Sequence, residues 1–488
     1  MRTNTNIKTR RPYEPRTKRS SFARPIKPAV KIDAKINSEP TVKFAALGGL
    51  EEIGRNMMFF EYGDEIVLID AGLQFPEETT PGIDFIIPNV SYLESKKKNI
   101  KALIITHGHL DHIGAVPYIM EKIGNPPIYT TMLNKEMLKR RQEEFSNAPK
   151  LNFEIVKDGE THQISKNFKA TFFDVVHNIP EGVGIVLDTP IGKIVHPGEF
   201  KFDYDIDGSP VKMDVWKNLG EQKIHTLLLD STGADKQGYS LSERIVEAEI
   251  EKIFKKAEGR IIVGTFASLL DRLGEIIKIA EKHNRKIFIS GFSMKANIQI
   301  AQNLGYMKIK KETIAPLEEI NKYRDDKIVV LCTGAQGEPN ASLMRIINGE
   351  HRQIQIKKGD TVLLSSSIVP GNERSVQILM DDIARQGGII YHSRMVDIHS
   401  SGHAPQEELK AVMKMVKPKF FIPIHGYYFM RWRNTQLAQE TLKMKPEQTV
   451  LVDNGQPILL SKNAATVSEE IIPTYYVMVD GLGVGDVG

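Results

Sequence analysis

The sequence predicts an α/β fold with two structured modules behind a disordered, basic N-terminal tail. Residues 42–235 contain short apolar runs separated by turn residues, a pattern typical of strands. Residues 236–385 alternate strand-like and helix-like stretches, which favours parallel βαβ units. Strand and helix patterns return in residues 386–460, and a linker is expected over residues 461–488.

The tail, residues 1–41, holds the excess positive charge of the chain. Residues 1–40 contain eleven Lys and Arg against three acidic residues, whereas all 488 residues contain 65 Lys and Arg against 61 Asp and Glu. With five prolines and almost no large apolar side chains, the tail cannot bury enough surface to offset its ordering entropy. We favour a sequence-independent anchor for RNA or the ribosome. A solvated tail and an organelle-targeting address are the alternatives.

Composition excludes several classes of protein. The single cysteine, Cys332, excludes a disulfide framework and a cysteine-based zinc site, and it fits a reducing compartment. No stretch approaches the roughly 18 uninterrupted apolar residues of a membrane helix, and no secretory signal is present. We therefore expect a cytoplasmic protein without membrane contact.

Turn residues and apolar runs locate the elements of the first module. The turn at residues 62–65 separates two strands within 57–71, and the turn at 189–192 closes a hairpin over 184–195. The apolar run 101–106 predicts a buried strand that precedes a helix from about residue 113. The further strands expected here are 42–47, 169–176 and 227–229.

The second module begins at a helix-start signal. Ser240 and Glu243 form an S-x-x-E capping box, which predicts a helix to about residue 257. Strands are then expected at 260–265, 286–290, 327–331 and 361–365, and helices at 269–282 and 295–304. The last regular elements are expected to end near residue 454.

The most informative motif is an H-x-H-x-D-H cluster directly after an apolar strand. It consists of His107, His109, Asp111 and His112. Imidazole and carboxylate are ligand types of catalytic zinc. A short loop leaving a strand can direct the first two histidines at one metal, while Asp111 and His112 reach a second. Two such metals, about 3.5–4 Å apart, would clamp both oxygens of a phosphoryl displacement.

This cluster resembles the signature of the metallo-β-lactamase superfamily, whose αββα sandwich is the fold that the resemblance implies. Asp70, which follows an apolar strand, resembles the first motif, whose aspartate orients the metal-binding loop. His177 and His425 match the metal ligands of later motifs. The resemblance implies one zinc on His107, His109 and His177, and a second on Asp111, His112 and His425.

Glu199 departs from the superfamily pattern. The usual motif has an aspartate that bridges the two metals, whereas this chain has Pro197-Gly198-Glu199-Phe200. Glutamate is one methylene longer and still a hard oxygen donor. We favour a bridging role with shifted metal spacing, and weakened binding of the second metal is the alternative.

Further motifs resemble the β-CASP branch, and specifically ribonuclease J, over about residues 43–488. Residues 229–232, 398–404 and 423–426 resemble motifs A, B and C of that branch. Residues 48–54, 265–268, 333–339 and 365–373 are closer still to ribonuclease J. The resemblance implies that a metallo-β-lactamase domain occupies residues 42–235 and 386–460, with an inserted β-CASP domain at 236–385. Residues 461–488 resemble the entry into a C-terminal domain, so we expect that the domain is absent or the chain truncated.

The resemblance also implies a pocket for a 5′-monophosphorylated RNA end. Small hydroxyl donors and a guanidinium beside glycines suit a terminal phosphate, although turn chemistry is the better explanation of each serine taken alone. The expected phosphate-binding residues are Ser231, Ser268, Arg272, Ser366, His399 and Ser401. Asp111, His403 and Asp70 are the expected catalytic residues, with His403 at the scissile phosphate.

The implied activity is that of a zinc-dependent ribonuclease with two Zn²⁺ per chain, and Mn²⁺ or Mg²⁺ as substitutes in assays. It would cleave single-stranded RNA both 5′→3′ exonucleolytically and internally, by two-metal hydroxide attack, in RNA maturation, rRNA processing and mRNA decay. Ribosomes or RNA-decay proteins are expected partners, and a homodimer or tetramer is expected if a C-terminal domain is present.

Three rival functions stay open. The substitution at Glu199 motivates a catalytically weak RNA-binding subunit of an RNA-decay complex. A glyoxalase- or lactonase-type hydrolase is disfavoured, because such enzymes need neither the inserted module nor motifs A and B. A DNA-directed β-CASP nuclease is the third.

Overall fold

The structure, a computed structural model, describes residues 39–76, 82–205, 207–369, 371–481 and 483–486. The predicted disorder of the tail falls on residues 1–38 and so lies outside the described residues. The first element among the described residues is strand β1 (Thr41–Gly48).

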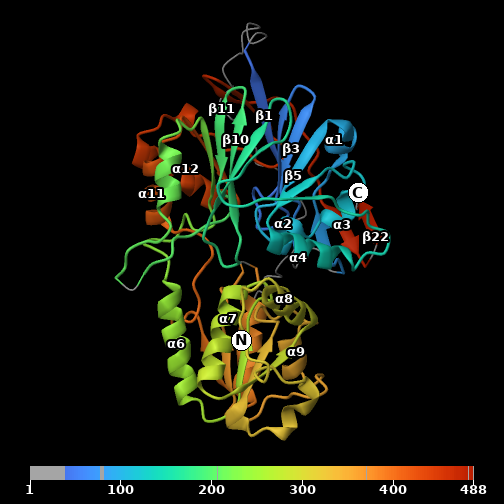
Figure 1. Cartoon of the computed structure of the whole chain (residues 1–488), viewed down its shortest axis with the longest axis vertical. Coiled ribbons are helices and arrows are strands. Elements are labelled where there is room, and N and C mark those ends of the chain that lie inside the picture. Colours follow the sequence, from blue (N-terminus) through green and yellow to red (C-terminus); the bar gives the residue numbers. More distant parts are fainter. Residues whose placement is uncertain (1–38, 77–81, 206, 370, 482, 487–488) are drawn as a thin grey trace, which may run out of the picture. The chain divides into compact units, whose positions relative to one another are not determined.

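Within the described residues, two sheets pack face to face in the metallo-β-lactamase domain (Figure 1). The first has the order β20-β19-β1-β2-β3-β5-β6-β7 and the second β18-β12-β11-β10-β9-β8. The remaining strands of the first sheet are β2 (Met57–Tyr62), β3 (Glu65–Ile69), β5 (Ile100–Ile104), β6 (Ile128–Thr130), β7 (Phe153–Ile155), β19 (Ile458–Ser461) and β20 (Ala465–Val467). Those of the second are β8 (Thr161–Gln163), β9 (Lys169–Asp174), β10 (Val183–Thr189), β11 (Gly192–His196), β12 (Thr226–Asp230) and β18 (Phe420–Ile424).

The period-2 alternation of strand side chains explains this packing. Val42 and Phe44 of β1 face the core shared with the second sheet, whereas Ala45 and Leu47 face the helices on the opposite side. Because both faces of the central strands are covered, these strands are apolar almost throughout. The result is a four-layer α/β/β/α sandwich.

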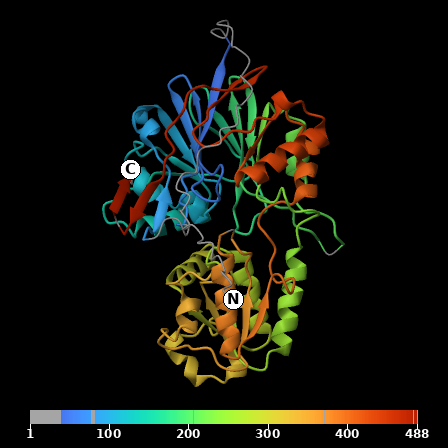
Figure 2. The same cartoon turned by 180° about the vertical axis from the view of Figure 1, so that it is seen from behind.

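Helices cover both outer faces of this sandwich (Figures 1 and 2). Those beside the first sheet are α1 (Ser91–Glu94), α2 (Leu110–Ile113), α3 (Val116–Ile119) and α4 (Met132–Gln142). Those beside the second are α5 (Asp214–Gly220), α11 (Gln406–Val416) and α12 (Tyr428–Leu442). Trp216 of α5 packs there with Phe200 and Phe202.

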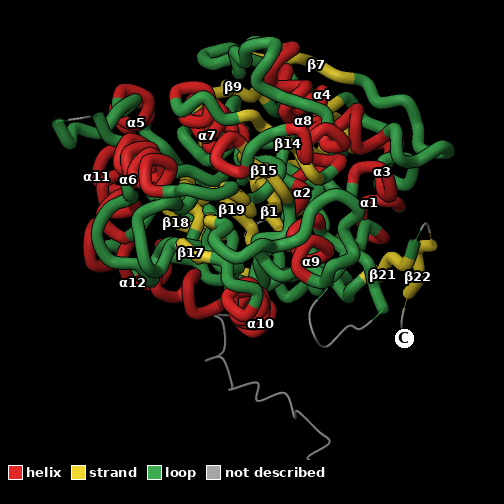
Figure 3. Tube along the Cα trace, turned by 90° about the horizontal axis from the view of Figure 1, so that it is seen from below, coloured by secondary structure: helices red, strands yellow, loops and turns green. Residues whose placement is uncertain are grey.

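The β-CASP domain is a parallel sheet of order β14-β15-β13-β16-β17 between two layers of helices (Figure 3). Ile261 and Val263 of β13 pack with α6, α7 and α8, and Ile262 packs on the other face with α9 and α10. The strands are β13 (Ile261–Gly264), β14 (Lys286–Ser290), β15 (Ile328–Cys332), β16 (Thr361–Leu364) and β17 (Ile389–His392). The helices are α6 (Glu243–Lys256), α7 (Leu270–Lys282), α8 (Phe292–Asn303), α9 (Ser342–Ile347) and α10 (Glu373–Arg385).

A small third sheet joins the last described residues to the first domain. Its order is β22-β21-β4, and the strands are β4 (Phe85–Ile87), β21 (Val477–Asp480) and β22 (Gly483–Asp486). Short 3₁₀ turns complete the chain: η2 (Lys97–Asn99), η3 (Leu317–Lys322), η4 (Asp325–Lys327) and η5 (Pro446–Gln448). Among the described residues, no helix combines the length and the apolar character needed to cross a membrane.

The structure differs from the sequence prediction at several element ends. The helix expected from about residue 113 begins at Leu110 as the single turn α2. Regular structure does not end near residue 454, because β19 pairs with β1. The sheets also extend past residues 385 and 460, where the domain limits were expected, since β17 pairs with β16 and β19 reaches Ser461. Those limits stay predictions.

The capping box at the start of α6 does not form as predicted. Ser242, not Ser240, is the N-cap, and its Oγ accepts a hydrogen bond from the Arg244 N–H at 3.3 Å. The Glu243 carboxylate turns away toward Lys201 and Arg272. Two strong cations outcompete a backbone N–H for this carboxylate, because charge-assisted pairs are the stronger interaction.

Candidate metal centre and adjoining cavity

The predicted metal ligands follow the carboxyl ends of neighbouring strands. His107, His109, Asp111 and His112 follow β5, while His177, Glu199 and His425 follow β9, β11 and β18. Strands β11, β12 and β18 are parallel to one another, and β3 is parallel to β5, so these ends meet at one edge of the sandwich. The topology thus gathers residues that are more than 300 positions apart in the sequence.

The first group of donors is His107, His109, His177 and Glu199. The His109 Nδ1 atom lies 3.0 Å from His107 Nε2 and 3.3 Å from His177 Nε2. The Oε2 atom of Glu199 lies 3.5 Å from His107 Nε2 and 3.3 Å from His177 Nε2. Three imidazole nitrogens and one carboxylate oxygen therefore converge.

The second group is Asp111, His112, Glu199 and His425. The other carboxylate oxygen of Glu199, Oε1, lies 2.7 Å from Nε2 of both His112 and His425. The Asp111 Oδ2 atom lies 3.5 Å from His112 Nε2 and 3.9 Å from His425 Nε2. Glu199 is thus shared, with one oxygen facing each group.

The electrostatics of the two groups differ. Burial, reinforced by neighbouring imidazoles, lowers the pKa of His107 and His109, and it lowers the pKa of His177 to about 3. Burial would also lower the pKa of His112 and His425, but Glu199 and the adjacent aspartates raise both well above the usual range. These same histidines hold the pKa of Glu199 well below its usual range despite burial.

Hydrogen bonds on the far side of the rings set the orientation of the histidines. The Asp70 carboxylate lies 2.8 Å from His112 Nδ1 and accepts hydrogen bonds from the Thr106 N–H and hydroxyl. The Nδ1 atom of His177 donates to the Gly402 carbonyl at 2.7 Å. Fixing one ring nitrogen directs the other toward the shared carboxylate.

Two turns at the candidate metal centre have strained backbone. Asp70 and His425 both adopt positive φ, at 61° and 51°. Such conformations cost about 1–3 kcal/mol for residues other than glycine and persist where the surroundings hold them. Here the hydrogen bonds of the Asp70 carboxylate to Thr106, and the 2.7 Å hydrogen bond between the Thr232 hydroxyl and His425 Nδ1, hold these two conformations.

Asp230, of motif A, joins two of the histidines. Its Oδ2 lies 2.7 Å from His403 Nδ1, and its Oδ1 lies 3.3 Å from His425 Nδ1. The Nε2 atom of His403 lies 3.8 Å from Glu199 Oε2, so its free nitrogen faces the metal centre. Sequence reasoning noted the motif without giving Asp230 a role, because the contact depends on a histidine 173 residues away.

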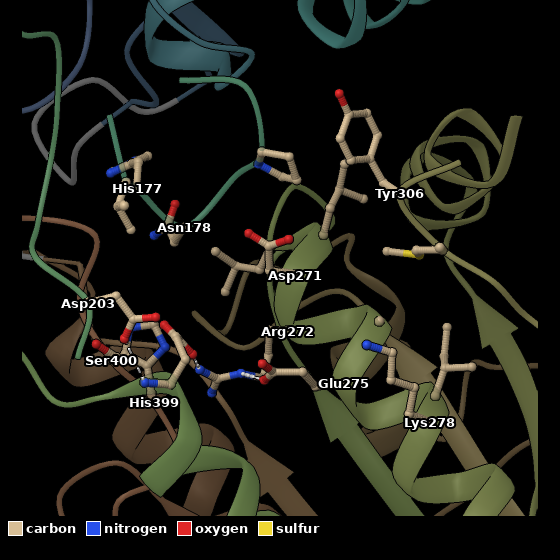
Figure 4. A pocket seen from close by; sticks show the side chains of 18 of the residues that line it. His177, Asn178, Asp203, Asp271, Arg272, Glu275, Lys278, Tyr306, His399 and Ser400 are labelled. Carbon is tan, nitrogen blue, oxygen red and sulfur yellow. Dashed lines mark hydrogen bonds and ion pairs between the residues drawn. The ribbon is translucent and has the colours of Figure 1, made fainter. Parts of the chain in front are cut away.

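A cavity of about 230 Å³ adjoins the metal centre (Figure 4). His177, Asp203, Glu243, Asp271, Arg272, Lys278 and His399 are among its lining residues. Burial and the Arg272 charge lower the pKa of His399 to about 3, so its imidazole is neutral.

The predicted phosphate-binding residues are only partly gathered in that cavity. Arg272 and His399 line it, and the other four residues do not. Ser268 and Ser366 follow the carboxyl ends of β13 and β16, Ser231 is buried against Asn434, and the Ser401 hydroxyl accepts from the His403 N–H.

Arg272 is already engaged by protein groups. Its guanidinium pairs with Glu243 and lies 3.3 Å from Glu275 Oε2, and it donates to the Ile398 carbonyl at 2.7 Å. Lys201, which sequence reasoning missed, pairs with Glu243 at 2.5 Å and donates to Ser400 at 2.8 Å. The signal available in the sequence was a lysine between two phenylalanines, Phe200 and Phe202, which suggests a buried and therefore paired charge.

The donor set fits two divalent metal ions. Each group offers imidazole nitrogens and carboxylate oxygens within 4.8 Å of one another, which are ligands that zinc prefers. The buried Nε2 atom of His425 has no hydrogen-bond partner among the described residues, although it lies beside Glu199. A buried imidazole nitrogen in that position is explained by a metal ligand role.

Three family models match successive parts of the chain. Residues 50–229 match the metallo-beta-lactamase superfamily, and residues 258–383 match the beta-CASP domain of ribonuclease J. Residues 391–432 match the RNA specificity domain of zinc-dependent metallo-hydrolases.

Curated relatives match most of the chain. It is 40% identical to Ribonuclease J 1 of Streptococcus pyogenes serotype M3 over 91% of this chain and 78% of that one. It is 38% identical to Ribonuclease J of Thermus thermophilus over 91% and 78%, and 34% identical to Ribonuclease J2 of Bacillus subtilis over 93% and 81%. A crystal structure of an Enterococcus faecalis protein of unknown function aligns with a TM-score of 0.57 at 14% identity, over 87% of this chain and 100% of that one. That likeness shows the fold alone.

We predict that Glu199→Gln lowers the metal content of the purified protein, because a neutral amide cannot neutralise two dications. Metal analysis by plasma mass spectrometry should show the loss of at least one equivalent. Glu199→Asp keeps the charge and should retain more metal than the Gln variant. Equal metal content in wild type and Glu199→Gln would place Glu199 outside the ligand set.

A second prediction concerns Glu275, whose pKa burial and neighbouring acids raise to about 7 despite Arg272. In the unfolded chain the Glu275 carboxyl loses its proton above about pH 4.5, whereas in the folded chain it keeps the proton to about pH 7. The stabilising contribution of Glu275 to folding is therefore lost as the pH rises from 4.5 through 7. Glu275→Gln should therefore gain stability over wild type with rising pH, by up to about 3 kcal/mol.

Urea unfolding at pH 5 and pH 8 measures this difference. The exposed Glu258→Gln, just after α6, is the matched control and should show no such pH-dependent gain. If the free energies of unfolding of wild type and Glu275→Gln differ by the same amount at pH 5 and pH 8, the raised pKa of Glu275 is ruled out.

Proposed function

Since the chain belongs to the ribonuclease J family and is a metal-dependent ribonuclease, we propose that it hydrolyses RNA both 5′→3′ from its end and internally. These activities would serve RNA maturation, including rRNA processing, and mRNA decay. The observation that carries the proposal is the shared carboxylate of Glu199, which has one oxygen facing each of two donor groups.

The metal ligands in this proposal are the two donor groups. His107, His109 and His177 would hold one ion, Asp111, His112 and His425 would hold the other, and Glu199 would contribute one carboxylate oxygen to each group. Two Zn²⁺ suit these nitrogen and oxygen donors, and Mn²⁺ or Mg²⁺ could replace them in assays. When bound, such ions lower the pKa of water toward neutrality and neutralise charge on the phosphodiester.

The remaining residues position the ligands and the substrate. Asp70 acts through His112 and the Thr106 turn, so we assign it a positioning role. Asp230 holds Nδ1 of His403, which leaves His403 Nε2 free to donate a hydrogen bond to the scissile phosphate. Asp111 would be a metal ligand, and we propose that its partly exposed carboxylate also takes part in catalysis.

The 5′-monophosphate preference rests on the residues at the carboxyl ends of the β-CASP strands. Parallel sheets bind ligands at that edge, where Ser268 and Ser366 lie. His399 and Ser401 come from the loop that Arg272 anchors through the Ile398 carbonyl. We therefore propose that Arg272 holds this loop, while the serines and His399 donate to the phosphate together with backbone N–H groups.

The position of Glu199 favours an active enzyme over a catalytically weak partner subunit. Its longer side chain still brings the two oxygens within 2.7–3.5 Å of four histidine nitrogens.

Single-stranded RNA is the substrate partner. The ribosome-directed tail, the homodimer or tetramer and the cytoplasmic location stay predictions.

We predict that wild type degrades 5′-monophosphate RNA faster than 5′-triphosphate or 5′-hydroxyl RNA, and that a chelator stops all cleavage. His399→Ala should slow degradation of the monophosphate RNA about ten-fold, because one hydrogen bond to a charged group is worth about 1.5–3 kcal/mol. His399→Ala should slow the cleavage of a circular RNA less than this, because a circular RNA has no 5′ end.

Gel electrophoresis of end-labelled RNAs gives these rates, and His162→Ala on β8 is the matched histidine control. A wild type that ignores the 5′ group, or equal losses on linear and circular RNA, would contradict the pocket. Metal-loaded wild type that cleaves no RNA would contradict the proposed function itself.

A further inference from the structure

Helix α12 reverses the usual distribution of polar and apolar side chains. Arg431 and Asn434 are completely buried, whereas Tyr428, Phe429 and Trp432 are 52%, 60% and 40% exposed. Folding alone favours the opposite arrangement, since a helix normally buries its aromatic residues and exposes its charges. The reversal is confined to the first turns, because Leu437 and Ala438 further along are buried.

The buried polar residues of α12 support the metal-ligand turns. The Arg431 guanidinium donates to the Gly426 carbonyl at 3.1 Å and to the Val452 carbonyl. The Asn434 side chain donates to the carbonyls of Leu229 and Asp230 at the end of β12. The inward face of α12 is therefore occupied by groups that hold the ends of β12 and β18.

The outward aromatic residues form one compact surface, the α12 platform, consisting of Tyr428, Phe429 and Trp432. The rings of Phe429 and Trp432 lie 5.9 Å apart with planes 27° from parallel. The Arg431 guanidinium lies 5.8 Å from the Tyr428 ring, and Arg433 is partly exposed in the next position. The surface thus offers exposed aromatic faces, and the partly exposed Arg433 beside them pairs with Glu440 at 3.5 Å.

The platform lies close to the metal centre. Its first member follows His425 by three residues, and Met430 packs against Gly426 in the intervening turn. At 1.5 Å of rise per residue, Trp432 is only about 6 Å further along the helix axis than Tyr428. Figure 1 shows α12 beside the second sheet of the sandwich.

We propose that the α12 platform stacks unpaired bases of the RNA strand whose phosphodiester reaches the metal centre. This inference rests on the proposed function and adds a base-binding subsite to it. Aromatic faces bind every base without sequence preference, so the exposed rings beside the candidate metal centre suit an unpaired RNA strand. A protein partner is disfavoured, because three side chains provide far less than the area of a standard interface.

Tryptophan fluorescence tests the platform directly. The chain has two tryptophans, and Trp216 is buried in the sandwich, so Trp432 is the exposed reporter. Oligo(A) RNA, added with chelator to prevent cleavage, should quench Trp432 through stacking. An abasic oligomer of equal length carries the same phosphates without bases and should leave the fluorescence unchanged. Trp216→Phe provides the single-tryptophan background.

Variants then measure the contribution of the rings. Phe429→Ala and Trp432→Ala should each raise the Kd for oligo(A) about ten-fold, while Trp432→Phe should restore most of the affinity because it keeps an aromatic face. Ile378→Ala on α10, another exposed large apolar residue, should not change the Kd. Thermal unfolding and metal content establish that the variants fold.

Three outcomes would overturn the inference. Unchanged oligo(A) affinity in both alanine variants would exclude stacking. If the alanine variants lose affinity for the abasic oligomer as much as for oligo(A), the rings act through phosphate contacts and not through base stacking. A dimer that dissociates on Trp432→Ala, with RNA affinity unchanged, would make the platform a protein interface. Failure of the proposed function is separate, because it would appear as RNA binding by wild type without metal-dependent cleavage.

Discussion

The carboxylate of Glu199 is the interaction on which the site depends. A buried carboxylate is stable only when positive charge and hydrogen bonds compensate its lost hydration. Here the imidazoles of His112 and His425, each 2.7 Å from Glu199 Oε1, supply most of that compensation, and Glu199 in turn raises the pKa of both. Metal ions would replace those protons, because a metal ligand must present an unprotonated nitrogen. The two donor groups are therefore electrostatically linked, and changing Glu199 affects both.

The fold brings the donors to Glu199 through the carboxyl ends of its strands. Each ligand lies on a short turn, and the turns are held from behind by Asp70, by Asp230 and by the polar residues of α12. The same logic extends to the β-CASP domain, where Arg272 anchors the loop that contains His399. Lys201 and Glu243 connect that anchor to the segment that contains Glu199. The candidate metal centre is thus connected to this network of ion pairs through the backbone between Glu199 and Lys201.

Much of this arrangement could be predicted from the sequence, because the metal motif is local and most strands are apolar runs between turn residues. The misses have physical reasons. Glu243 left its capping box for Lys201 and Arg272, partners that are 42 and 29 residues away. Arg272 was expected to bind the 5′-phosphate; that role stays a prediction, and the sequence did not indicate that two partly buried acids pair with its guanidinium. Pairings between distant segments leave no local pattern, and the inverted burial of α12 contradicts the pattern that the sequence suggests.

Anomalous diffraction from crystals of the wild type grown with Zn²⁺ tests the central claim most directly, because it locates each ion relative to Glu199. Two peaks are expected, one among His107, His109 and His177 and one among Asp111, His112 and His425. Each should lie about 2.0–2.2 Å from a different oxygen of Glu199. A single peak, or two peaks of which only one touches Glu199, would contradict the claim that this carboxylate bridges two metals.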